Sequence, residues 1–397
     1  MKLYHRIILG LTCLIALSYL CLKIWMYRAD QENARSLTVK SDHGNSFTIV
    51  QFTDLHFGEH DESDNKSITV MKSVLDNEPE TDLVVFGGDQ VSGYVLYDSK
   101  EVSVKWLESI KTVADLHIPF VTIFGNHDDQ PFVTIPLSWR RWVVPLLLVN
   151  LTALICSMVI PRYRRFCWIA ITSSIPVLWM FIVGYPSSVM RRTLMHYEQA
   201  HFTPYSQSRE LNGLSNYYIP ITNGNKTALV FLLDSGGGRL YEGYTDNQIK
   251  WVQTVSSLYP GTVSIAFAHI PSFEFENPAD DWCFGNEFTE PGEFTGWESM
   301  IPMRSLAASG VKAAFFGHNH KNSHCCMPQQ DDKFTHSMPV MCYGRHTGYG
   351  GYGNWTRGAR VIQLNFSSDQ EGGIAISTWL RMEDQTKRAT AVIFPFS

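Results

Sequence analysis

Short apolar runs recur along most of this chain, and longer amphipathic stretches separate them. The runs predict β-strands at Phe47–Thr53, Leu83–Phe86, Phe120–Phe124, Ala228–Leu233, Val263–Ala268 and Val311–Phe316. Helices are predicted between them at Lys100–Leu116, Asp246–Leu258 and Trp297–Ala308. Apolar strands that alternate with helices indicate an α/β domain whose sheets are buried on both faces.

Five of these strands are followed directly by residues with oxygen or imidazole side chains. The five motifs are Asp54-Leu55-His56, Gly87-Gly88-Asp89, Gly125-Asn126-His127-Asp128, Ala268-His269 and Gly317-His318-Asn319-His320. Side chains at the carboxyl ends of strands converge on one crevice in α/β sheets. Imidazole and carboxylate together, without thiolate, suit Mn, Fe, Zn, Co or Ni rather than Ca or a structural zinc ion.

Each of these residues alone has an ordinary explanation. Asp54 or Asp89 alone is typical of a turn or a helix N-cap, and His269 alone is typical of a partly buried histidine. The pair His318 and His320 is a stronger signal, because alternate residues of an extended segment share a face. Five recurrences in one order favour a shared metal site.

In this order, DxH, GGD, GNHD, a strand-end histidine and GHxH resemble the calcineurin-like metallophosphoesterase superfamily. Leu233–Gly236, Ala268–Pro271, Cys342–Arg345 and Gly348–Gly353 further resemble its purple acid phosphatase-related subgroup with a DxH first motif. The resemblance covers residues 47–130 and 187–382. It implies a two-sheet α/β sandwich and a metallophosphoesterase domain over residues 47–382.

The resemblance also implies a site with two transition-metal ions, Mn, Fe or Zn. Asp54, His56 and His320 would hold one ion, Asn126, His269 and His318 the other, and Asp89 would bridge them. Two such ions activate a bridging water for in-line attack on a phosphate ester. His127 would stabilise the transition state or protonate the leaving oxygen, so His127 and Asp89 are the expected catalytic residues.

Two departures from the superfamily patterns concern the third position after Asp89. Purple enzymes have a tyrosine there, and phosphoprotein phosphatases have an aspartate that orients the catalytic histidine. This chain has Ser92. An Fe(III)–tyrosinate site is therefore not expected, and the partner of His127 stays open, with Asp128 as its neighbour in sequence.

Substrate binding is expected from Asn126 and from a glycine-rich loop that carries Arg345 and His346. Arg345 is a candidate phosphate contact. The alternative is a solvated loop whose glycines form turns. The expected substrate is a phosphorylated small molecule or a phosphoprotein. Two other functions stay open: a non-catalytic membrane interaction module on the same fold, and a phosphodiesterase acting on lipid headgroups or nucleotides.

Two apolar regions interrupt the α/β pattern. Residues 7–27 are long enough to anchor the chain in a bilayer and are predicted to be a signal-anchor, with a signal peptide as the alternative. Residues 142–185 predict an inserted hairpin of two transmembrane helices around Arg162, Arg164 and Arg165. The loop with these three arginines would face the cytosol, in agreement with the positive-inside rule. The same orientation would place four other arginines on the lumenal side, which argues against it; they are Arg140, Arg141, Arg191 and Arg192. A gene-model artefact, in which Gln130 would join Ser187, and a buried soluble hairpin are the alternatives.

Charge and cysteine usage bound the partners and the compartment. Lys and Arg number 32 against 38 Asp and Glu, so nucleic-acid binding is not expected. The eight cysteines are too few for a disulfide-rich scaffold, although Cys326 and Cys342 could pair in an oxidising lumen. Five glycosylation sequons fit a membrane protein whose catalytic domain faces the secretory lumen or the outside; they are Asn65, Asn150, Asn225, Asn354 and Asn365.

Overall fold

The computed structural model describes residues 35–130, 187–285, 302–328, 338–366 and 373–395, apart from positions 97, 239, 276 and 277. The predicted segments 7–27 and 142–185 lie outside these residues, and both stay predictions. Among the described helices, none combines the length and the apolar character needed to cross a bilayer.

A six-stranded sheet carries the first three motifs. Its order is β14-β13-β12-β2-β3-β4, and the bounds of its strands are β2 Ser46–Phe52, β3 Thr81–Phe86, β4 Phe120–Thr122, β12 Gly358–Asn365, β13 Ala375–Met382 and β14 Lys387–Phe394. The strands β2, β3 and β4 run parallel. They therefore deliver the residues that follow them to the same edge.

An eight-stranded sheet carries the last two motifs. Its order is β1-β5-β6-β7-β9-β11-β10-β8, and the bounds of its strands are β1 Leu37–Thr38, β5 Tyr217–Asn223, β6 Lys226–Leu233, β7 Val263–Ala268, β8 Pro278–Phe284, β9 Val311–Phe316, β10 Cys325–Pro328 and β11 Val340–Tyr343. The strands β6, β7, β9 and β11 run parallel at its centre.

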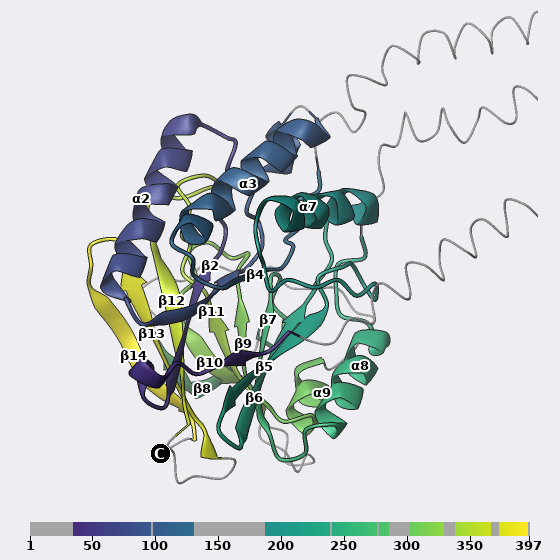
Figure 1. Ribbon diagram of the computed structural model, residues 1–397, viewed down its shortest axis with the longest axis vertical. Coiled ribbons are helices and arrows are strands. Elements are labelled where there is room, and N and C mark those ends of the chain that lie inside the picture. The colour runs from purple at the N-terminus through teal and green to yellow at the C-terminus, as the bar shows by residue number, and fades with distance from the viewer. Residues whose placement is uncertain are drawn as a thin grey trace, which may run out of the picture.

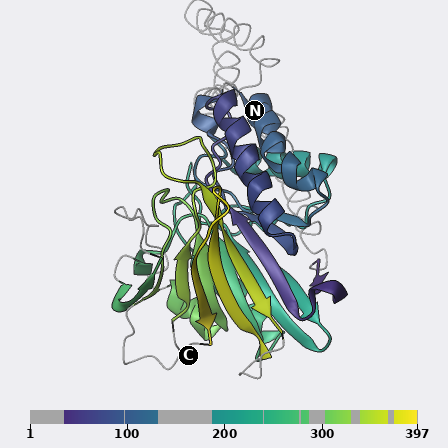
Figure 2. The same ribbon diagram turned by 90° about the vertical axis from the view of Figure 1, so that its left-hand side faces the viewer.

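The two sheets pack face to face, with helices on both outer faces (Figures 1 and 2). Helices α2 (Asp61–Asn77), α3 (Ser99–Asp115) and α7 (Ser187–His201) cover the six-stranded sheet. Helices α8 (Asp246–Ser257) and α9 (Pro302–Ala308) cover the eight-stranded sheet. Short 3₁₀ turns lie at Ser41–His43, Gly93–Val95 and Phe273–Phe275.

This layering explains why the strand sequences are apolar throughout. In β2, Ile49 packs in the core between the sheets, and Val50 packs in the core beneath the helices. The predicted two-sheet sandwich is thus the fold observed. The sheets also include β1 and β14, which lie outside the expected range 47–382.

The predicted elements match the structure closely where local signals are strong. Val263–Ala268 and Val311–Phe316 have the predicted bounds. Helix α3 begins after Asp98, whose carboxylate accepts hydrogen bonds from the backbone of Lys100 and Glu101. Strand β4 ends at Thr122, two residues before its predicted end, and the hydroxyl of Ser215 accepts a hydrogen bond from the backbone N–H of Phe124.

Two disulfides join the last three strands, β11, β10 and β8, at one side of the eight-stranded sheet. Cys325 lies opposite Cys342 on β11, and Cys326 lies opposite Cys283 on β8, and each opposing pair is bonded. The expected pairing of Cys326 with Cys342 is wrong. Adjacent residues of a strand point to opposite faces, so Cys326 faces away from the core between the sheets, where Cys325 and Cys342 meet.

Candidate metal centre

The five motif loops meet in one hollow at the carboxyl ends of β2, β3, β4, β7 and β9. The hollow has a volume of about 680 Å³, and His56, Asp89, Asn126, His127, His318 and His320 are among the residues that line it. Residues 264 positions apart in the chain contact each other here: the backbone N–H of His318 donates a hydrogen bond to Asp54. The parallel strands deliver these residues to one edge of the sandwich.

The first ligand cluster consists of Asp54, His56 and His320, whose candidate ligand atoms all lie within 4.8 Å of one another. Nε2 of His56 is 3.1 Å from Nε2 of His320, and that atom is 3.6 Å from Oδ1 of Asp54. All three side chains are buried. Two imidazole nitrogens that face each other beside a carboxylate form a donor set that a cation fits.

The second ligand cluster consists of Asp89, His269 and His318. Nδ1 of His269 donates to the carbonyl of Gly87 at 2.9 Å, which directs its Nε2 toward Asp89 at 3.1 Å. Oδ1 of Asn126 is 3.1 Å from Nδ1 of His318, so the amide joins this cluster.

Oδ2 of Asp89 faces both clusters. It lies 3.7 Å from Nε2 of His56 and 3.1 Å from Nε2 of His269. The other oxygen, Oδ1, accepts a hydrogen bond from the backbone N–H of His127 at 2.8 Å, which fixes the carboxylate plane. Oδ1 therefore fixes the orientation of the Asp89 carboxylate, and Oδ2 is directed between the two ligand clusters.

Unusual backbone conformations gather at these residues. Seven described residues other than glycine have a positive φ, and four of them belong to the clusters: Asp54, His56, Asp89 and His318, with φ between 50° and 72°. Left-handed backbone is unfavourable for such residues and persists where the surrounding structure enforces it, which happens most often at functional sites.

Burial and mutual charge shift the pKa values of the candidate ligands in different directions. Burial raises the pKa of Asp54 to about 7 and lowers the pKa of His56 to about 4. Burial also lowers the pKa of His269, but the carboxylates of Asp89 and Asp54 outweigh it and raise that pKa to about 10. A proton on His269 thus occupies the place beside two carboxylates where a cation fits, and neutral His56 keeps the lone pair that ligation requires.

His127 lies at the edge of the centre. Its side chain is 33% exposed, and its Nε2 is 3.9 Å from Oδ2 of Asp89. Asp128 does not orient it: the carboxylate of Asp128 is buried and accepts hydrogen bonds from the backbone N–H groups of Asp89, Val91 and Gly125. Asp128 therefore joins two motif loops.

Arg345 and His346 do not line the hollow. Arg345 is buried, and its guanidinium donates to the carbonyl oxygens of Thr356 and Lys321. His346 is also buried and packs on His320, with 4.0 Å between the ring centroids. A phosphate contact by Arg345 does not fit this position, because its donors are directed to backbone carbonyls that hold the loop.

Sequence patterns did not identify several residues that shape the hollow. Glu59, His60, Tyr94 and Tyr352 line it, and the ring of Tyr352 stacks on His320 at 4.1 Å. The ring of Tyr94 lies 5.0 Å from that of His127. No metal-ligand motif includes these positions, although Glu59 and His60 closely follow the first motif and Tyr352 lies within Gly348–Gly353.

A buried ion network supports the second cluster from behind. Arg191 of α7 donates to Asp129, to Asp234 and to the carbonyl oxygen of Gly125, and none of the three side chains is exposed. The loop that carries Asn126 is thus bound to a helix that follows the 142–185 segment. Arg191 is therefore a structural residue of the described domain.

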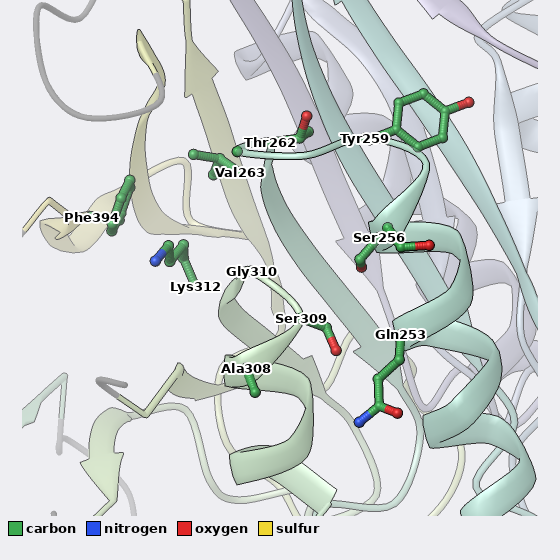
Figure 3. A pocket seen from close by; sticks show the side chains of 12 residues that line it. Gln253, Ser256, Tyr259, Thr262, Val263, Ala308, Ser309, Gly310, Lys312 and Phe394 are labelled. Carbon is green, nitrogen blue, oxygen red and sulfur yellow. The ribbon is translucent and has the colours of Figure 1, made fainter. Parts of the chain in front are cut away.

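A second hollow of about 440 Å³ lies at the opposite ends of β7 and β9 (Figure 3). Its lining includes Lys312, Phe394 and Tyr259 but no histidine, cysteine, aspartate or glutamate. It therefore offers no donor set for a metal ion.

Comparison with known proteins agrees with this geometry. A family model for the calcineurin-like phosphoesterases matches residues 47–322. The chain belongs to the calcineurin-like phosphoesterase family. The resemblance seen in the sequence motifs is confirmed, and the two clusters occupy the part of the chain that the family model covers.

The relatives of this phosphoesterase-family chain are purple acid phosphatase-like. It is 25% identical over 385 residues to "Probable inactive purple acid phosphatase 28" of Arabidopsis thaliana, with 86% of this chain and 81% of the relative covered. It is 26% identical over 391 residues to "Phosphatase DCR2" of Saccharomyces cerevisiae, with 88% of this chain and 55% of the relative covered.

Among solved structures, the purple acid phosphatase PPD1 from yellow lupin seeds is similar, with a TM-score of 0.49 and 12% identity. The match covers 87% of this chain and 53% of the lupin chain, so this chain spans about half the length of that enzyme.

Proposed function

We propose that this chain hydrolyses phosphate esters at a pair of transition-metal ions, Mn, Fe or Zn. The observation that carries the proposal is the position of Asp89, whose Oδ2 faces His56 of the first cluster and His269 of the second. Asp54, His56 and His320 would hold one ion, and Asn126, His269 and His318 the other. A bound pair would lower the pKa of water between the ions and draw charge from the phosphoryl oxygens.

The residues of the chain have separate roles in this reaction. The backbone N–H of His127 donates a hydrogen bond to Asp89 and so positions that carboxylate, while the imidazole of His127 stays at the edge of the hollow. The partly exposed imidazole can give a proton to the leaving oxygen, which typically contributes about 10²–10⁴-fold to a rate. Asn126 is the substrate-binding residue that lines the hollow, and Arg345 and His346 support the adjacent loop.

The hollow at the two clusters has a volume of about 680 Å³, which suits a phosphorylated small molecule or a phosphorylated protein side chain. The test uses the full chain purified in detergent and supplied with Mn, or with Fe and Zn. Hydrolysis of a panel of phosphate monoesters and diesters decides between a phosphatase and a diesterase for lipid headgroups or nucleotides.

Two variants test the assigned roles. Asp89→Ala and His127→Ala should each lower kcat/KM at least tenfold, and Asp89→Ala should also lose bound metal. His127→Ala should keep its metal, because His127 belongs to neither cluster. A loss of less than tenfold in both variants would count against the proposed roles.

A non-catalytic module on the same fold is the second candidate, and the "inactive" in the names of three Arabidopsis relatives favours it. Metal analysis separates the two functions. A full chain that binds two transition-metal ions and turns over a phosphate ester supports hydrolysis, whereas a folded chain with neither metal nor activity supports the module.

We also propose that the catalytic domain faces an oxidising compartment, the secretory lumen or the outside, from a membrane anchor. The two disulfides support this side of the membrane, because such bonds are rare in the cytosol. Asn126 and His269 share one centre although residues 142–185 lie between them, so any crossings by that segment must be even in number.

A further inference from the structure

The carboxylate of Glu59 connects three loops of the centre. Its Oε1 accepts hydrogen bonds from Oγ of Ser92 at 2.6 Å and from the hydroxyl of Tyr94 at 3.1 Å. Its Oε2 accepts one from the backbone N–H of Gly351 at 2.9 Å. These partners come from the loop after β3 and from the glycine-rich loop, whereas Glu59 itself follows the first motif by three residues.

Ser92 passes this contact on to a candidate metal ligand. Its Oγ lies 2.8 Å from Nδ1 of His56, and the hydroxyl is fully buried. A carboxylate can only accept hydrogen bonds, so the single proton of Ser92 goes to Glu59. The oxygen of Ser92 must then accept the proton of Nδ1, which makes His56 the Nδ1–H tautomer.

That tautomer has a direct consequence for the first cluster. The lone pair of His56 lies on Nε2, which is the atom that faces His320 at 3.1 Å and Asp89 at 3.7 Å. Burial raises the pKa of Glu59, but hydrogen bonds from Ser92 and Gly351 outweigh this and keep the pKa below its ordinary value. Glu59 is therefore ionised at neutral pH, as the proton order requires.

We propose that Glu59 is a positioning residue that acts through Ser92 to fix the orientation and tautomer of His56 for the first metal ion. The inference rests on the proposed two-metal function. Partners that bind the second nitrogen of a metal-ligating histidine typically contribute about 10–100-fold to metal affinity. The chain from Glu59 to His56 places such a partner at the position where purple enzymes have their tyrosine.

The experiment measures Zn affinity of the full-length protein by competition with a chromophoric chelator, with metal content determined by mass spectrometry. Glu59→Gln and Ser92→Ala should each lower the affinity for one of the two ions about 10–100-fold and leave the affinity for the other ion unchanged. The double variant should bind that ion no more weakly than the weaker-binding of the two single variants does, because both changes break the same chain of contacts. The unfolding midpoints of the variants and the wild type are also compared in excess chelator. Equal midpoints without metal show that a variant has lost metal affinity and not its fold.

Glu62→Gln is the matched control. Glu62 is three positions further along, it is exposed, and it pairs only with exposed Lys66 among the described residues, so this variant removes the same charge without touching the chain of contacts. Its Zn affinities should equal those of the wild type.

Two results overturn the inference, and they are distinguishable. If the wild type binds two ions and Glu59→Gln binds both as tightly as Glu62→Gln, Glu59 does not position His56 and the proposed function stands. If the wild type binds no transition metal, the proposed function fails together with the inference.

Discussion

Nε of Arg191 lies 2.7 Å from Oδ2 of Asp129, and neither side chain has any contact with solvent. The same guanidinium pairs with buried Asp234, so one cation bridges two carboxylates behind the loop that carries Asn126. Burial disfavours the charged arginine, but the two carboxylates outweigh it and raise the pKa of Arg191 above its ordinary value. The network links the part of the chain before residue 131 to the part after residue 186.

Arg191→Met should therefore lower the free energy of unfolding by about 3–5 kcal/mol, because it leaves two buried carboxylates without their cation. The neighbouring Arg192 offers a matched control, since it forms only an exposed pair with Glu210 at 3.6 Å among the contacts described. Arg192→Met should cost less than about 1 kcal/mol. Urea denaturation of both variants checks the difference, and equal losses would contradict a structural role for Arg191.

Gly237 tests how closely the loop after β6 supports Asn126. A Cβ at Gly237 would lie 2.4 Å from Cβ of Asn126, and its φ of 88° is left-handed. Gly224 also has a left-handed φ, 60°, but a Cβ there meets nothing within 4 Å. Gly224→Ala should cost about 1–2 kcal/mol from backbone strain alone.

Gly237→Ala should cost about 1–3 kcal/mol more than Gly224→Ala because the added methyl also displaces Asn126. It should lower occupancy of the second ion, which metal analysis measures, whereas Gly224→Ala should leave both ions bound. Equal metal content in the two variants would mean that the loop after β6 does not position Asn126.

Glu198 predicts a pH dependence of stability away from the metal centre. Its carboxylate is fully buried and accepts hydrogen bonds from Trp106 and Thr122. Burial raises the pKa of Glu198 from 4.5 to about 7 despite these bonds. Between these two pH values the folded state keeps a proton that the unfolded state has lost, so this group makes the protein less stable as pH rises from about 4.5 to 7.

Glu198→Gln removes that titration with little change of shape. The unfolding free energy of the variant relative to the wild type should therefore increase between pH 5 and pH 8, by up to about 3 kcal/mol. Urea denaturation at both pH values measures it. A difference that stays constant with pH, or that shrinks as pH rises, would contradict a buried neutral carboxyl at this position.

Glycan attachment tests the proposed compartment. Asn65, Asn225 and Asn354 are exposed in sequon contexts, whereas Asn365 is partly buried in β12. The protein expressed in eukaryotic cells should carry glycans at one or more of the exposed sites, which peptide mass spectrometry before and after enzymatic deglycosylation identifies. Free cysteines at 325, 326 and 342 together with unmodified sequons would place the domain in a reducing compartment.

The sequence predicted the candidate metal ligands better than the residues that surround them. The five motif loops are brought together because each follows a strand, and a parallel strand determines where its next residues lie. Ser92 could be recognised as a departure from the purple enzymes, but its contact with Glu59 depends on two loops that adjoin only in the folded chain. Arg345 looked like a phosphate ligand because a sequence does not reveal whether a cation is already engaged by backbone carbonyls.

The misassigned cysteine pairing and the role of Arg191 have a similar origin. Cys325 and Cys326 are adjacent in sequence, and only the register of β10 with β8 and β11 assigns them different partners. Arg191 follows an apolar segment, where an arginine is typical of a membrane boundary, and its burial depends on carboxylates 43 and 62 positions away.

The rings of Tyr94 and Tyr352 border the hollow next to His127 and His320. A phosphate ester bound at the ligand clusters would lie close to these two phenol faces. A flat leaving group can rest on such a face, and a bulky branched one must push it aside. The selection of substrates can thus begin at this entrance, before the phosphorus atom is approached.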